Sequence, residues 1–65
     1  MNNQEIPMAI SLKTKVELSH QCKTENGIED DESFIIKSVV GNYEKVKIEN
    51  QYGQRFVINP NQLKS

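Results

Sequence analysis

The side chains best suited to chemistry in this 65-residue sequence are His20 and Cys22, two positions apart. A structural zinc site needs four ligands, and the chain has one His and one Cys. A cysteine nucleophile needs a base and an orienting group, which His20 with Glu25 or Asn26 would supply, but side chains two apart share a face only within a strand. A chain this short also has little room for a substrate pocket of ~300 Å³. We therefore predict no enzyme activity, no metal site and no cofactor.

Length and composition indicate one small domain. With 35% hydrophobic residues and no Trp, the chain has modest material for a core. The lone Cys22 excludes an internal disulfide and favours a reducing, cytoplasmic location. No run of about 18 apolar residues predicts a membrane-spanning helix, and residues 1–5 lack the layout of a signal peptide.

The charges are unevenly distributed along the chain. The net charge is −1, which gives no global attraction to nucleic acid or to a membrane. Five of the nine acidic residues lie between Glu25 and Glu32, so the rest of the chain is mildly basic. The acidic run lacks the residue layout of a calcium loop. Two interpretations of the acidic run are open: a solvated loop, or a contact for a basic protein partner.

The first half of the chain is expected to contain an arm, a strand and a loop. Residues 1–9 are polar and predict a flexible N-terminal arm, followed by a single β-barrel domain over residues 10–65. From Ile10 to His20, apolar and polar residues alternate, which is typical of a strand with one buried face. Residues 21–33 are polar and predict a long connection.

A hairpin is expected from the runs at residues 34–40 and 44–50, which are β-branched or alternating. A three-residue loop between them gives the register that keeps apolar side chains on one face. The pairs in this register are Ile36 with Ile48 and Ser38 with Val46.

A second hairpin follows. Residues 51–53 suit a three-residue loop that ends with Gly53 in the left-handed conformation. Its register pairs Ile48 with Phe56 and Val46 with Ile58. It also pairs Glu49 with Arg55, two opposite charges that attract each other across the strands. Pro60 then ends the strand and predicts a short 3₁₀ turn, after which Leu63 returns to the core.

Four strands, a long loop after the first, two tight hairpins and a closing turn resemble an SH3-like small barrel over residues 10–65. The resemblance implies an all-β fold, a small SH3-like five-stranded barrel of antiparallel hairpins. The Ala-Leu-Tyr-Asp-Tyr stretch and the Trp pair of signalling SH3 domains are absent, since the first strand ends in Val16-Glu17-Leu18-Ser19. No ligand residue is therefore carried over. Barrels of this kind are common in small bacterial and phage-encoded proteins.

The sequence offers a candidate protein interface in two parts. In the expected register, aliphatic residues face solvent beside Lys and Arg, and apolar patches on a surface mark interaction sites. The candidate residues are Ile35, Val39 and Val57 on the sheet and Glu29, Asp30, Asp31 and Glu32 in the acidic run. We predict a non-enzymatic protein-interaction module that docks a protein partner or itself.

The alternative is a weak nucleic-acid-binding barrel. Basic strands would contact phosphates, and exposed tyrosines would stack on bases. The candidate residues are Lys37, Lys45, Lys47, Arg55, Tyr43 and Tyr52. The sequence pI of about 5.7 argues against this reading, because dedicated nucleic-acid binders are usually strongly basic.

Overall fold

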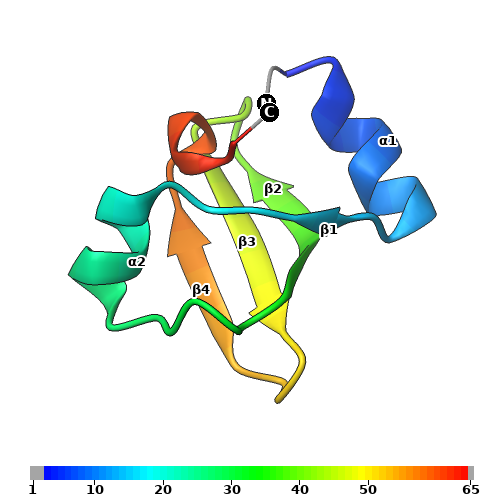
Figure 1. Cartoon of the computed structure of the whole chain (residues 1–65). Helices are drawn as coiled ribbons and strands as arrows, with labels where there is room; N and C mark the ends of the chain where they lie inside the picture. Colours follow the sequence, from blue (N-terminus) through cyan, green and yellow to red (C-terminus); the bar gives the residue numbers. More distant parts are fainter. Residues whose placement is uncertain (1–2, 65) are drawn as a thin grey trace.

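The structure, a computed structural model, describes residues 3–64 (Figure 1). Its elements in chain order are α1 (Glu5–Leu12), β1 (Lys15–Val16), α2 (His20–Asn26), β2 (Phe34–Val40), β3 (Lys45–Asn50), β4 (Arg55–Ile58) and a 3₁₀ turn, η1 (Pro60–Gln62). The four strands form one antiparallel sheet in the order β1-β2-β3-β4. The predicted all-β, five-stranded closed barrel is therefore wrong, because the sheet is open and two helices accompany it.

The helix α1 occupies part of the segment that was expected to be an arm and a strand. Ile6, Ala9 and Ile10 recur at helical spacing, so a helix brings all three to one side. Ile6 and Ala9 are buried, and Ile10 packs against the core. Pro7 is tolerated because it lies in the first turn, where its missing N–H has no helical partner. Residues 1–2 lie outside the described part of the chain.

Helix α2 replaces the first part of the expected polar connection. The Ser19 Oγ accepts a hydrogen bond from the Cys22 backbone N–H at 3.2 Å, which caps the start of the helix. Gly27, with φ +65°, ends it in the left-handed conformation that glycine adopts without strain. Only Cys22 of this helix is buried, and Ile28 directly after it is buried too, so two side chains attach the segment to the core.

The β3–β4 hairpin confirms the predicted register. Ile48 lies opposite Phe56 and Glu49 opposite Arg55, and Gly53 has φ +82° in the turn. The Asn50 N–H donates to the Gln54 carbonyl at 2.9 Å, which closes a loop of residues 51–53.

The β2–β3 register is only partly as predicted. The pair Ile36 with Ile48 is correct, but the pair Ser38 with Val46 is wrong. An irregularity between Ile36 and Ser38 places one extra residue in β2, so Ser38 lies opposite Lys47 and Val39 opposite Val46. The connecting loop is also one residue longer than expected, since it spans residues 41–44.

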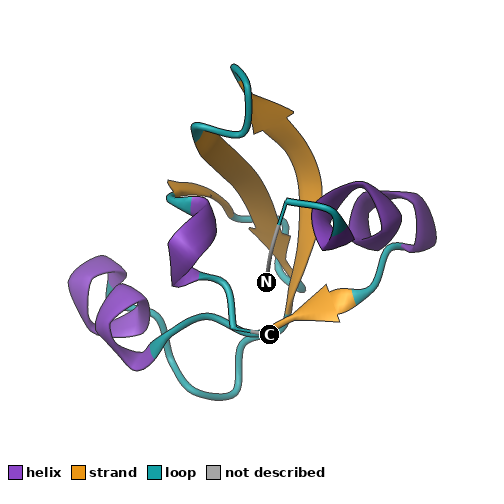
Figure 2. Ribbon diagram, turned by 90° about the horizontal axis from the view of Figure 1, so that it is seen from above, coloured by secondary structure: helices purple, strands orange, loops and turns teal. Residues whose placement is uncertain are grey.

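The core lies on one side of the sheet. Residues 17–19 cross over the sheet and pair with residues 62–64, and an isolated bridge joins Leu18 to Leu63 (Figure 1). Leu63 is buried and Pro60 begins the 3₁₀ turn, as predicted. In Figure 2, α2 and the 3₁₀ turn lie on the core side, while α1 lies beside the edge of β2. No helix covers the opposite face of the sheet within residues 3–64.

Candidate binding face

The uncovered side of the sheet carries a cluster of basic and aliphatic side chains, which we call the basic face. Paired residues of an antiparallel sheet point to the same side, so the register assigns its members. The members that the register assigns are Lys15, Ile35, Ser38, Val40, Lys45, Lys47, Glu49, Arg55 and Val57. Lys37 lies at the irregularity and has no partner in the register, but its ion pair with Glu49 places it on the same face. The intervening residues, such as Ile48 and Val46, point into the core and are fully buried.

The charge of the basic face is strongly positive. Five cations meet one carboxylate, which gives a formal +4, whereas the whole chain has −1. The structure therefore brings together Lys37, Lys45, Lys47 and Arg55, which the sequence had marked as a candidate nucleic-acid contact. Lys15 joins these four cations on the basic face. Its pairing with Ile35 places it there, and the predicted strand at residues 10–20 already assigned it to the solvent side.

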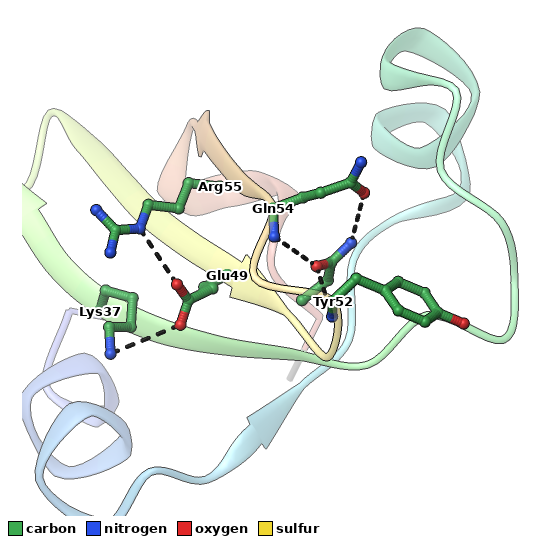
Figure 3. Close-up of polar contacts among 6 residues, drawn as sticks. Lys37, Glu49, Tyr52, Gln54 and Arg55 are labelled. Atoms are coloured by element: carbon green, nitrogen blue, oxygen red, sulfur yellow. Dashed lines mark hydrogen bonds and ion pairs between the residues drawn. The ribbon is translucent and has the colours of Figure 1, made fainter.

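The single carboxylate on this face, Glu49, is shared by two cations. Its Oε1 lies 3.2 Å from the Arg55 Nε and its Oε2 lies 3.7 Å from the Lys37 Nζ (Figure 3). The Arg55 side chain is 75% exposed, so the pairs are solvated and contribute about 0–1 kcal/mol each. Their main effect is to hold two cations in place. Lys45 is fixed separately, because its Nζ donates to the Asn59 Oδ1 at 2.6 Å.

Three aliphatic side chains lie among these charges. Val57 is 57% exposed and Val40 is 40% exposed, and Ile35 is half-buried. The prediction that Val39 faces solvent as part of an interface is wrong. The extra residue in β2 turns Val39 inward, where it packs against the core. Val40 takes the outward position in its place.

The two tyrosines do not lie on the basic face. Tyr43 is half-buried in the 41–44 loop and packs against the core. Tyr52 is 70% exposed, but it lies in the 51–53 turn and its ring points away from Glu49 and Arg55 (Figure 3). Phe56, the aromatic residue of β4, packs edge-on against Phe34 with ring centroids 5.8 Å apart. The outward positions of the strands within residues 3–64 therefore carry no aromatic ring.

The acidic run lies at one end of the sheet and is partly used for structure. The Glu32 carboxylate accepts from the Glu29 backbone N–H at 2.7 Å and from the Asn50 Nδ2 at 2.7 Å. Asp30 lies 3.6 Å from the Lys23 Nζ, and Asp31 is exposed. Glu32 thus anchors the loop, while the other three carboxylates face solvent.

Asn50 is a residue that sequence reasoning missed. It is 5% exposed, and its side chain makes four hydrogen bonds. The Oδ1 accepts from the backbone N–H groups of Tyr52 and Gln54, and the Nδ2 donates to the side chains of Gln54 and Glu32. The position immediately before a three-residue turn was the available signal, since Asn side chains bond their own turn. Asn50 therefore joins the β3–β4 turn to the acidic run.

His20 and Cys22 are not brought together. In α2 they are two positions apart, and such residues do not face each other on a helix. Burial raises the pKa of the Cys22 thiol, a hydrogen bond from Asn26 opposes the shift, and the Glu25 charge adds to it. The thiol is fully buried and stays protonated at neutral pH. Within residues 3–64, no three His, Cys, Asp or Glu side chains are grouped so that they could hold a metal ion.

A recess of about 340 Å³ lies between β1 and the acidic run. Its lining combines Lys15 and Lys23 with Glu17, Asp30 and Asp31. Because both signs of charge line it closely, the recess selects no class of charged ligand.

Comparison with known protein families, with curated proteins and with solved structures gives no match. The resemblance to SH3-like barrels therefore stays a prediction that these comparisons do not test. What the structure defines is a small α+β protein with an open antiparallel sheet. No helix among residues 3–64 has the length and apolar character needed to cross a bilayer.

Proposed function

We propose that this chain is a small protein-interaction module that docks an acidic segment of a protein partner on its basic face. The observation that carries the proposal is the charge contrast. Five cations and one carboxylate lie on a sheet face that no described helix covers, in a chain whose net charge is −1. Charge complementarity steers association and selects partners, so an acidic partner fits this face.

The aliphatic side chains favour a protein over a nucleic acid. Ile35, Val40 and Val57 offer apolar contact area between the lysines, as protein interfaces do. Single-stranded nucleic acids bind sheet faces by stacking on aromatic rings, and the outward strand positions of residues 3–64 carry none. The same cations would attract phosphates, so an oligonucleotide belongs in the test. The lone, buried Cys22 thiol supports a cytoplasmic location for this module.

The test is a titration with an acetylated eight-residue peptide of alternating Val and Glu, followed by NMR at low salt. A peptide of alternating Val and Lys is the matched control and is expected not to bind. Lys47→Glu, in the middle of the basic face, is expected to weaken binding of the Glu peptide by about 3- to 30-fold, since two units of charge change close to the ligand. Lys64→Glu makes the same charge change on an exposed residue that lies outside the four strands, in the segment that pairs with residues 17–19.

The outcomes separate the alternatives. Equal effects of Lys47→Glu and Lys64→Glu would show that binding follows net charge and not the basic face. An eight-nucleotide single-stranded DNA is titrated in the same way. If it binds more tightly than the Glu peptide and Lys47→Glu weakens its binding equally, the ligand of the basic face is a nucleic acid and the proposed protein partner is wrong.

A further inference from the structure

The strand β4 is the last strand of the sheet, and its backbone has a free edge. Pairs in an antiparallel ladder alternate between hydrogen-bonded and non-hydrogen-bonded. Because the Asn50 N–H bonds to the Gln54 carbonyl, the pair Ile48 with Phe56 is hydrogen-bonded and the pair Glu49 with Arg55 is not. The N–H and C=O groups of Arg55 and Val57 therefore point away from β3, toward the outer edge.

Nothing in the described part of the chain uses these groups. Among residues 3–64, the backbone hydrogen bonds outside the regular ladders include neither Arg55 nor Val57. The edge carries no proline and its pairing with β3 is regular over residues 55–58. The opposite edge strand, β1, has only two residues, and the chain that follows it pairs with residues 62–64. β4 is thus the edge that can accept another strand.

We propose that the acidic segment of the partner adds to β4 as an antiparallel fifth strand. This inference rests on the function proposed above and specifies how the partner binds. An added strand uses main-chain hydrogen bonds for affinity and alternate side chains for specificity. Partner residues opposite Arg55 and Val57 would share the basic face, and the residue opposite Phe56 would lie on the core side.

The side chains around the edge define the chemistry of the added strand. Carboxylates on its outward side chains would meet Arg55, which is 75% exposed, and would lie one strand away from Lys47. An aliphatic side chain on its other face would meet Phe56, whose side chain is half-buried. The expected ligand is therefore an extended segment in which acidic and aliphatic residues alternate. A second copy of this chain fits less well, because two basic faces would then lie side by side.

The experiment uses N-methylated versions of the Val/Glu peptide with the unmodified protein. In the antiparallel register, the Glu residues direct their N–H groups to β4 and the Val residues direct theirs to solvent. Methylation of the Glu amides is expected to weaken binding by more than about tenfold, since several hydrogen bonds are lost, whereas methylation of the Val amides is expected to change affinity less than threefold. Amide hydrogen exchange at Arg55 and Val57 is expected to slow when the unmodified peptide binds.

Two results would overturn strand addition. Equal binding of both methylated peptides, with Lys47→Glu still weakening it, would leave the basic face as the binding site and remove the β4 edge. Slow exchange at Arg55 and Val57 without peptide, together with a concentration-dependent dimer, would assign the edge to a second copy. Failure of the unmodified peptide to bind at all would instead contradict the proposed function itself.

Discussion

The replacement of Asn50 with Ala is expected to lower the free energy of unfolding by about 2–4 kcal/mol. The Asn50 side chain makes four hydrogen bonds at 2.7–3.0 Å and is 5% exposed. Each of these hydrogen bonds contributes roughly 0.5–1.5 kcal/mol net to the free energy of unfolding. In the variant, the backbone N–H groups of Tyr52 and Gln54 can bond to water instead, which offsets part of the lost stability. A chain of this size is stable by roughly 3–10 kcal/mol, so the variant loses a large share of its stability.

The measurement is urea unfolding followed by far-UV circular dichroism. With a slope of about 1 kcal/mol per M, the midpoint is expected to fall by about 2–4 M. Asn42→Ala is the matched control, because Asn42 is an exposed turn residue. If Asn50→Ala does not fold, Gln54→Ala removes one of the same side-chain bonds and is expected to cost about 1 kcal/mol. A loss below about 0.5 kcal/mol for Asn50→Ala would refute the role assigned to this side chain.

Three further predictions concern the register, the turn and the thiol. Val39→Ser is expected to cost about 1–2 kcal/mol and Val40→Ser less than about 0.5 kcal/mol in the same urea assay, because only Val39 packs against the core; equal losses would contradict the extra residue in β2. Gly53→Ala is expected to cost about 1–2 kcal/mol from backbone strain alone, since φ is +82° and nothing lies within 4 Å of the added Cβ; an unchanged melting temperature would argue against this turn. The pKa of the Cys22 thiol is raised on folding, so its contribution to the free energy of unfolding is complete below its ordinary pKa of 9.0 and is lost as pH rises through the folded value. Cys22→Ala is expected to make the free energy of unfolding fall less steeply with pH in this alkaline range; a pH slope equal to that of the parent protein would contradict the raised pKa.

The chain from β3 to the 3₁₀ turn was predictable because its signals are local. The β3–β4 hairpin combines strict alternation, a Gly53 that takes positive φ and an attractive pair between Glu49 and Arg55. Each of these features requires the same register. The structure confirms that register and the 3₁₀ turn that begins at Pro60.

The first half was only partly correct, because its sequence supports two hydrophobic periods: of the strand expected at residues 10–20, only Lys15–Val16 forms one. The alternation from Ile10 to Leu18 favours a strand, whereas Ile6, Ala9 and Ile10 favour a helix. In α1, Ile6 and Ala9 are buried and Ile10 packs against the core. The helix hides Ile6 completely, which a short polar arm could not do. The start of α2 was signalled by a capping serine, but with Cys22 as its only buried residue the segment has no amphipathic pattern to detect.

The charged residues of the basic face were predicted on the outward side, whereas Val39 and the two candidate tyrosines do not lie on this face. Alternation assigned Lys37, Lys47 and Arg55 to the outward side, and the sheet places them there. Val39 was misplaced because an extra residue in one strand inverts every side chain beyond it. The sequence contains two adjacent valines at that point, so either can face the core, and only the packing of the completed sheet selects Val39.

Net charge was a weak argument against an anionic ligand, and the dimensions of the molecule explain why. Electrostatic fields in physiological salt decay over about 8 Å, whereas the molecule extends over 27 × 20 × 19 Å. A ligand on the basic face therefore responds to its local +4 more than to the carboxylates of the acidic run. Glu32 reinforces this separation, because its bond to Asn50 holds the acidic run at the turn end of the sheet. The fold thus converts a chain of nearly balanced charge into one with a distinctly basic sheet face.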